Sequence, residues 1–321
     1  MSDGHTLLKA VDLRKHYRIA SGFRRNLLLR AVDGVSMSVD NDEIVGLLGE
    51  SGSGKTTLGR LLTGVEAPDA GKVFIEGEEL ARYLRSNRVR VQMIFQNPDT
   101  SLNPRMRVRD ILIEALRAGG RDHHHPDTLV AELLEDVGLG RDCADYYPHQ
   151  LSGGMKQRVA IARALSVRPK FVVADEMVSA LDATVKNNIL NLVKRLQRQY
   201  GFSMLFISHD LPAAVRVSDR VLVMYLGRVV EEARSEELVE SPAHPYTQYL
   251  LSSLPSLYLK ILGRSGDARV RFSGEPPSPL SIPKGCRLHT RCPYVKEVCR
   301  RDEPPEVRVS ATHKVFCHLR S

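Results

Sequence analysis

The sequence lacks any apolar run approaching the roughly 20 residues that a membrane-spanning helix requires. Its first five residues lack the basic and apolar blocks of a secretion signal. The net charge is +8, from 46 basic and 38 acidic residues, but no dense basic run is interleaved with aromatic residues. This charge suits an anionic membrane face or nucleic acid, and equally a solvated basic surface. We predict a cytosolic protein that does not bind nucleic acid.

Cysteine is scarce over most of the chain. Cys143 is the only cysteine before residue 286, and structural disulfides are not expected in a cytosolic protein. The composition, 42% hydrophobic and 26% charged, is ordinary for a globular protein. The 321 residues suffice for one large domain or two moderate ones with an ample core.

Residues 49–56 carry two glycines separated by four residues and followed by Lys and Thr. An apolar segment at 43–48 predicts a buried strand before them, and the apolar spacing after them predicts a helix. Glycines let backbone N–H groups surround phosphate oxygens, and the positive end of the helix points at the same place. Lys55 would reach the β- and γ-phosphates, and Thr56 would ligate Mg²⁺. The alternative is a glycine-rich turn that binds nothing. The predicted nucleotide-binding residues here are Gly49, Glu50, Ser51, Gly52, Ser53, Gly54, Lys55, Thr56 and Thr57.

Strands and helices alternate along most of the chain, which predicts an α/β sheet with its site along one edge. Antiparallel-looking strands are expected first, followed by buried strands and helices. A basic loop is predicted at 18–30, and the histidine triplet at 123–125 is expected to be a solvated loop rather than a metal site. The predicted strands are 6–17, 32–39, 72–76, 91–95, 171–174, 203–207 and a pair within 221–230, and two helices lie within 108–138.

Polar residues follow three of the predicted buried strands. Asp175 is placed to hold Mg²⁺, and Glu176 would accept a proton from the water that attacks the γ-phosphate. Because successive strand residues alternate sides, Glu176 is expected to point away from Asp175. His209 would contact the γ-phosphate, and Gln96 would orient the water and join Thr56 and Asp175 at the Mg²⁺. Each residue alone is a weak signal.

Together and in this order, these motifs resemble the nucleotide-binding subunit of an ATP-binding cassette (ABC) transporter. The resemblance covers about residues 6–260 and includes a signature, Leu-Ser-Gly-Gly, at 151–154 and a loop at 179–182. It implies the P-loop NTPase cassette fold, with a RecA-like core, an antiparallel β subdomain and a helical subdomain at about 97–165. We expect this ATP-binding domain to span 1–262, followed by a small cysteine-containing appendage at 263–321.

The resemblance also implies a pair of facing subunits with ATP between them. Ser152, Gly153 and Gly154 would then act in trans on the ATP of the partner, through backbone donors at a helix N-terminus. Tyr17 falls where the family stacks an aromatic ring on adenine, and a core tyrosine is the alternative.

Two positions depart from the family pattern. Met155 replaces the usual Gln at the end of the signature, and Met177 replaces the usual Pro after Glu176. Neither family residue carries the proposed chemistry, so an ATPase is still predicted, with local loop geometry and rate in question.

The resemblance narrows to the second ATPase of an oligopeptide or dipeptide permease. It rests on the segment 96–106, on His-Pro-Tyr-Thr at 244–247 and on four late cysteines. It implies import of peptides, powered from the cytoplasmic face of the cell membrane. The implied partners are two integral membrane permease subunits that dock near 97–106, a second and distinct ATPase and, indirectly, an extracytoplasmic solute-binding protein.

The late cysteines are Cys286, Cys292, Cys299 and Cys317. They lack the close pairs of common zinc modules, yet four thiolates suit Zn²⁺ or an iron–sulfur cluster and would supply a missing core. The resemblance favours [4Fe–4S] over Zn²⁺. Four reduced, unliganded cysteines remain the alternative, and the possible substitute ligands are His289, His313 and His318.

Two other functions remain open. The same subunit could power import of nickel or an oligosaccharide, because the ATPase does not touch cargo. A non-transport ABC protein acting on DNA or ribosomes would instead carry two cassettes or a long coiled-coil insertion, and this sequence has neither.

Overall fold

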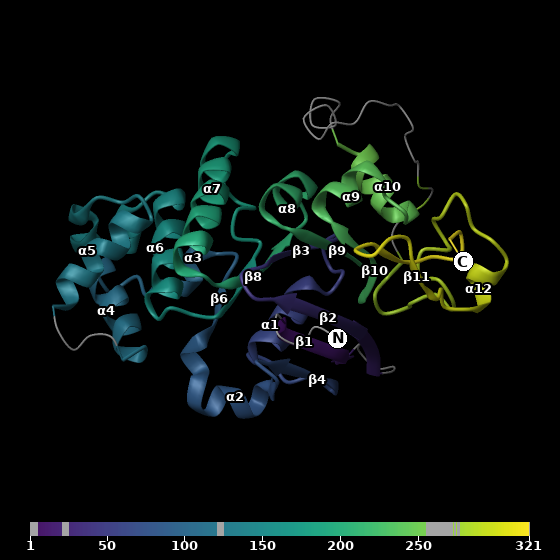
Figure 1. Cartoon of the computed structure of the whole chain (residues 1–321), viewed down its shortest axis with the longest axis horizontal. Coiled ribbons are helices and arrows are strands. Elements are labelled where there is room, and N and C mark those ends of the chain that lie inside the picture. The colour runs from purple at the N-terminus through teal and green to yellow at the C-terminus, as the bar shows by residue number, and fades with distance from the viewer. Residues whose placement is uncertain are drawn as a thin grey trace.

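The computed structural model describes residues 6–20, 26–120, 125–254, 272, 274 and 277–320. Two sheets lie at its centre, and helices α4 and α5 form a separate lobe at one end of the long axis (Figure 1). The C-terminal segment lies at the other end (Figure 1). In the part described, no helix is both long and apolar enough to cross a membrane.

The smaller sheet is antiparallel and has the strand order β2-β1-β4-β5. Its strands are β1 (Thr6–Ala20), β2 (Asn26–Asp40), β4 (Ala70–Ile75) and β5 (Glu78–Glu79). The prediction of antiparallel strands is confirmed, but the basic loop predicted at 18–30 is too long. Strand pairing continues to Ala20 and resumes at Asn26, because backbone hydrogen bonding tolerates the exposed basic side chains there.

The larger sheet has the order β11-β12-β10-β9-β3-β8-β7-β6. Strands β6, β7, β8, β3 and β9 are parallel, so their carboxyl ends meet at one edge. The strands are β3 (Ile44–Leu48), β6 (Val91–Ile94), β7 (Phe171–Asp175), β8 (Ser203–Ser208), β9 (Arg220–Tyr225), β10 (Arg228–Arg234), β11 (Glu306–Arg308) and β12 (Lys314–Phe316).

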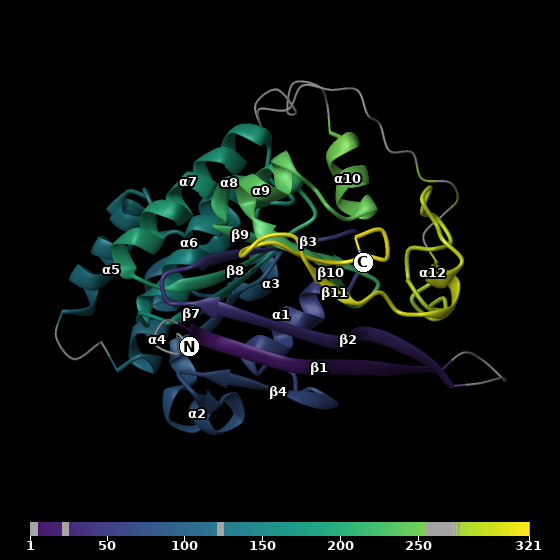
Figure 2. The same ribbon diagram turned by 45° about the vertical axis from the view of Figure 1, so that its right-hand side comes forward.

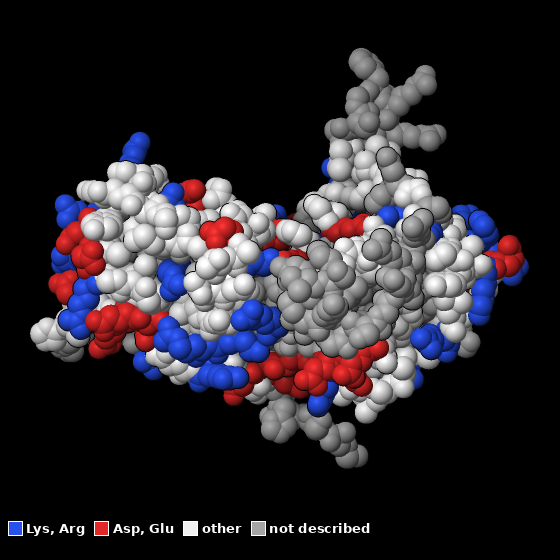
Figure 3. Space-filling view, turned by 90° about the horizontal axis from the view of Figure 1, so that it is seen from above, with Lys and Arg blue, Asp and Glu red and all other residues white. Residues whose placement is uncertain are grey.

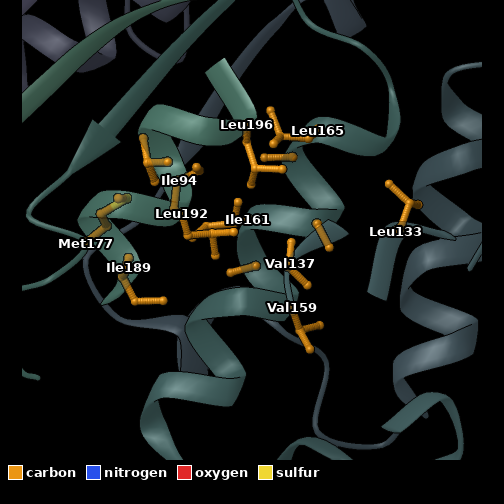
Figure 4. Packing of buried hydrophobic residues seen from close by; sticks show 14 of the residues in the cluster. Ile94, Leu133, Val137, Val159, Ile161, Leu165, Met177, Ile189, Leu192 and Leu196 are labelled. Atoms are coloured by element: carbon orange, nitrogen blue, oxygen red, sulfur yellow. The ribbon is translucent and has the colours of Figure 1, made fainter. Parts of the chain in front are cut away.

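Both faces of the parallel strands are buried, which explains their continuous apolar sequences. In β7, Phe171 and Val173 pack on the side of the antiparallel sheet, and Val172 and Ala174 pack on the opposite side. The first side is filled by α1 (Lys55–Thr63), and the second by α6 (Gly153–Ser166) and α7 (Ala183–Tyr200) (Figure 4).

Short helices complete the lobe and the periphery. They are α2 (Leu80–Asn87), α3 (Pro98–Ser101), α4 (Val108–Ala118), α5 (Pro126–Asp136), α8 (Leu211–Val217), α9 (Ser235–Glu240), α10 (Pro245–Ser252) and α12 (Val298–Arg301). Three 3₁₀ helices span Arg88–Arg90, Arg141–Asp145 and Pro148–Gln150. The two predicted helices within 108–138 are confirmed. The histidine triplet falls largely on residues outside the description, and only His125, the N-cap of α5, is placed.

The C-terminal segment adds strands to the main sheet. β12 pairs with β10, and Figure 2 shows this yellow segment running beside β10 above the antiparallel sheet. Glu231 of β10 is fully buried and accepts from His313 Nε2 at 2.7 Å. The predicted boundary at 262 lies outside the described residues.

Candidate nucleotide site

The loop between β3 and α1 needs glycine for steric reasons. Gly54 has φ of 104°, and a Cβ there would lie 1.9 Å from the carbonyl oxygen of Ala31. Gly49 is equally crowded, because its Cβ would lie 2.2 Å from the carbonyl oxygen of Met224. Gly52 also has a positive φ, 77°, but faces open space. The loop is therefore packed tightly against its neighbours and leaves one side open for a ligand.

Lys55 lies inside this loop with its side chain 4% exposed. Its ammonium donates to the carbonyl oxygens of Gly49 and Glu50 at 2.8 and 2.9 Å. Burial lowers the pKa of Lys55, and the nearby carboxylates of Glu176 and Asp175 partly offset that effect. An ammonium held by neutral carbonyls at a cavity wall can turn to phosphate oxygens when these arrive.

The first acidic residue lies against the start of α1. Thr56 Oγ1 donates to Asp175 Oδ1 at 3.1 Å, and Asp175 is only 4% exposed. Burial raises the pKa of Asp175, although the Thr56 hydrogen bond opposes it. A hydroxyl and a carboxylate oxygen at this distance are suitable oxygen ligands for Mg²⁺.

Glu176 lies in the site, and its partners differ from those of Asp175. β7 ends at Asp175, and Glu176 adopts a left-handed backbone with φ of 45°, which turns its side chain toward the loop. Its Oε1 lies 3.8 Å from Lys55 Nζ, and its Oε2 lies 3.2 Å from His209 Nδ1. Gln96 Nε2 donates to the same Oε2 at 3.4 Å. The ends of β6, β7 and β8 thus meet the glycine loop.

Other predicted loop residues have defined partners. The carbonyl oxygen of Ser53 accepts from the Gly227 N–H at 2.8 Å, and Ser53 N–H donates to Glu50 at 3.2 Å. The Glu50 N–H donates to the Tyr246 hydroxyl at 2.9 Å. Ser51 is exposed.

Tyr17 lies on β1, beside α1. Its hydroxyl donates to Glu66 at 2.7 Å, and its ring is half-buried. Burial and the Glu66 contact raise the pKa of Tyr17, while Thr57 lowers it, which places Thr57 beside Tyr17. Lys15 Nζ lies over this ring at 5.8 Å from its centre, and adenine stacking on Tyr17 stays a prediction.

The signature residues form a separate group at the start of α6. Ser152 is the N-cap and accepts from the Met155 N–H at 3.3 Å. Ser152 and Gly153 are exposed, while a Cβ on Gly154 would approach Val185 of α7 to 2.7 Å. Ser152 and Gly153 therefore lie at the surface of this chain.

The two departures from the family pattern have a packing explanation. Met177 is 1% exposed and lies in the core beside α6 and α7. Met155 packs against the same core. The flexible thioether side chains of the two methionines fill this space, and neither takes part in the role proposed for Glu176.

The cysteines do not form a ready metal site. Within the described part of the chain, no group of three or more His, Cys, Asp or Glu side chains is arranged to hold a metal ion. Cys286 and Cys292 pack against one apolar cluster and Cys317 lies in another, and burial raises the pKa of Cys286 to about 12. Cys143 is buried in the helical core.

Each histidine that could replace a cysteine ligand has one ring nitrogen in a hydrogen bond. His289 contacts the carbonyl oxygen of Cys286, His313 pairs with Glu231, and His318 contacts the carbonyl oxygen of Asp302. The predicted metal set lacks support in this arrangement, because the described residues hold no group arranged to bind a metal ion.

Sequence reasoning missed Tyr246 as a neighbour of the phosphate loop. The tetrapeptide at 244–247 was identified as typical of a subgroup, but nothing in its spacing indicates a contact with Glu50, 196 positions away. Ser179 was predicted only as the start of the loop at 179–182, and its hydroxyl lies 3.5 Å from Gln96 Nε2.

We predict that Gly54→Ala destabilises the chain more than Gly52→Ala does. Both substitutions place a side chain in the left-handed region, which costs about 1–3 kcal/mol. Only Gly54→Ala also forces a Cβ against the Ala31 carbonyl. Urea denaturation and nucleotide titration of the two variants test this. Equal unfolding free energies would show that the loop is not packed as described.

Two family models match the chain. "ABC transporter" covers residues 32–179, and "Oligopeptide/dipeptide transporter, C-terminal region" covers residues 230–299. The solved dimeric structure of a post-hydrolysis state of the ATP-binding cassette MJ0796 bound to ADP and Pi is similar, with a TM-score of 0.63 and 26% identity. That match covers 71% of this chain and 99% of the other.

Curated relatives match over nearly the whole length. The oligopeptide transport ATP-binding protein AppF of Bacillus subtilis is 41% identical over 98% of each chain. The dipeptide transport ATP-binding protein DppF of Escherichia coli is 43% identical over 89% of this chain and 86% of that protein. The chain therefore belongs to the ATP-binding proteins of the oligopeptide and dipeptide ABC transporters and is an ABC-type ATPase.

Proposed function

We propose that this subunit binds and hydrolyses MgATP to power the import of dipeptides or oligopeptides through a separate membrane permease. The observation that carries the chemistry is the convergence of six side chains at one edge of the sheet. They are Lys55, Thr56, Gln96, Asp175, Glu176 and His209. The peptide cargo is supported by the named relatives and by the match of the C-terminal region.

The roles follow from the contacts. Mg²⁺ would neutralise charge on the phosphates, and Thr56 and Asp175 offer it oxygen ligands, with Gln96 at its edge. Glu176 accepts the proton of the attacking water, which Gln96 orients. His209, 3.2 Å from Glu176, holds that carboxylate and reaches the γ-phosphate.

The ATP site would be completed by a partner subunit. Ser152 and Gly153 are exposed at the start of α6, so their hydroxyl and N–H groups can face the nucleotide of another cassette. The similar cassette was solved as a dimer, which supports this pairing. We propose a second, distinct ATPase as the partner.

The membrane subunits would dock on the segment after Gln96. This segment is tied to the signature helix, because Lys156 pairs with Asp99 at 2.7 Å and Arg163 donates to the Ser101 carbonyl. Movement of a docked permease helix would therefore pass to α6 and the signature. The subunit would accordingly work at the cytoplasmic face of the membrane, with a solute-binding protein acting on the far side.

Basic and acidic side chains lie in adjacent patches on the face shown in Figure 3. This mixture favours a solvated surface over a single-sign field for nucleic acid. We keep the prediction that nucleic acid is not a partner.

We expect Glu176→Gln to slow ATP turnover about 10²–10⁴-fold, because a general base is lost. MgATP binding should survive, since Lys55 and the glycine loop are unchanged. Steady-state hydrolysis and nucleotide titration of the assembled transporter measure the two effects. Near-normal turnover by the variant would remove Glu176 from the base role.

Gentle detergent extraction from native membranes tests the transport assignment. We expect two integral membrane subunits, a second ATPase and a solute-binding protein to co-purify with the tagged chain. Binding of peptides by that last protein supports the cargo, and binding of nickel or an oligosaccharide overturns it. Recovery of ribosomal or DNA-associated partners alone overturns transport.

We also propose that the four late cysteines take up a metal, [4Fe–4S] in preference to Zn²⁺. Cys299, Cys317 and Cys292 each affect the pKa of Cys286, so the thiols are neighbours. Thiolate ligands must lose their protons, so binding would need the raised thiol pKa values to fall.

Iron and zinc analysis of anaerobically prepared protein, with its visible spectrum, tests the metal proposal. We expect Cys299→Ser to lose the metal and Cys143→Ser, buried in another core, to keep it. Absence of both metals from the unaltered chain ends the proposal.

A further inference from the structure

The C-terminal part of the chain reaches the phosphate loop through one peptide unit. The carbonyl oxygen of Gly49 and the N–H of Glu50 belong to that unit. The carbonyl accepts from Lys55 Nζ at 2.8 Å, and the N–H donates to the Tyr246 hydroxyl at 2.9 Å. Because a peptide is planar, a hydrogen bond that holds its N–H also aims its carbonyl. Tyr246 thus orients the oxygen that holds the Lys55 ammonium.

Tyr246 is itself held firmly. It is fully buried, and its backbone N–H donates to His244 Nδ1 at 3.1 Å. The N–H of His244 donates in turn to the buried carboxylate of Glu231 at 3.0 Å. Glu231 is also bound by His313 of the C-terminal segment. A tyrosine held at the end of this chain of buried hydrogen bonds is a suitable support for a loop that changes its partners.

The side chain of Glu50 has a second partner. Arg291 Nη1 lies 3.6 Å from Glu50 Oε2, with the arginine side chain 7% exposed and the glutamate 30% exposed. The guanidinium also lies over the rings of Phe272 and Tyr249, at 5.2 and 5.8 Å from their centres. Arg291 is therefore held between an aromatic pair and the phosphate loop.

The guanidinium of Arg291 has few other polar partners. Within the described residues, Arg291 Nε and Nη1 are buried without a hydrogen-bond partner. Burial lowers the pKa of Arg291, but Tyr225 and then Glu50 raise it by more, so the net shift is upward. Glu50 is the carboxylate that pairs with this buried cation.

We propose that Arg291 and Tyr246 are positioning residues for ATP binding: Tyr246 aims the Gly49 carbonyl at Lys55, and Arg291 neutralises Glu50 beside the phosphates. This rests on the proposed ATP site. A glutamate in a loop that receives phosphate groups repels them unless its charge is compensated. Arg291 comes from the segment that carries Cys292, so that segment contributes directly to the nucleotide site.

The charge argument has a specific test in the full-length chain. Arg291→Gln leaves Glu50 uncompensated and should weaken MgATP binding about 5–20-fold. The double variant Arg291→Gln with Glu50→Gln removes the repelling charge as well and should restore affinity to within about 3-fold of the unaltered chain. A purely structural role for Arg291 would not be rescued in this way.

Tyr246→Phe tests the peptide orientation separately. It keeps the ring and removes the acceptor of the Glu50 N–H, so MgATP binding should weaken about 3–10-fold with little change in thermal unfolding. As a matched control, Arg308→Gln removes the same charge from the C-terminal segment at a side chain that is 74% exposed. It should bind MgATP as the unaltered chain does.

The outcomes separate the two proposals. If Lys55→Ala binds MgATP as tightly as the unaltered chain, the ATP site itself is wrong. If Lys55→Ala binds weakly while Arg291→Gln and Tyr246→Phe bind normally, only the positioning role fails. Failure of Glu50→Gln to rescue Arg291→Gln likewise overturns the charge role of Arg291.

Discussion

A buried ammonium group determines how the rest of the nucleotide site is arranged. The Lys55 side chain is 4% exposed, and burial of a charge is costly unless other groups compensate it. Two carbonyl oxygens and the Glu176 carboxylate provide that compensation. A loop with larger residues in place of Gly49 and Gly54 could not supply these carbonyls, because Cβ atoms there would collide with the surrounding backbone. The buried lysine therefore requires glycine at these positions of the loop.

The parallel sheet delivers the acidic groups to this lysine. β6, β7 and β8 are buried on both faces, so their apolar residues are used for packing and only their ends are free for polar side chains. Gln96, Asp175 and His209 lie at those ends. Glu176 is different, because its left-handed backbone lies outside the strand. A strained residue held between Lys55 and His209 is maintained by its surroundings, and such strain is typical of functional positions.

These features also mark the limit of prediction from sequence. The glycine loop, the buried strands and their polar ends follow local patterns, and the structure contains them where expected. The left-handed backbone of Glu176 was not predicted, because strand alternation says nothing about the first residue beyond the strand. The length of the β1–β2 pairing and the addition of β12 to β10 also escaped, since both depend on partners far along the chain. The contacts of Glu50 with Tyr246 and Arg291 escaped for the same reason.

The C-terminal segment has structural consequences beyond its cysteines. Arg287 donates to the Leu226 carbonyl and to Asp33, and Gly227 in that same turn donates to Ser53 of the phosphate loop. With Arg291 at Glu50, the segment meets the loop on two sides, once through a side-chain charge and once through the β9–β10 turn. Buried charge pairs depend strongly on distance, so any rearrangement of the segment carrying Arg287 and Arg291 changes the environment of the loop. Arg287 and Arg291 are therefore the route by which the C-terminal segment and the phosphate loop affect each other.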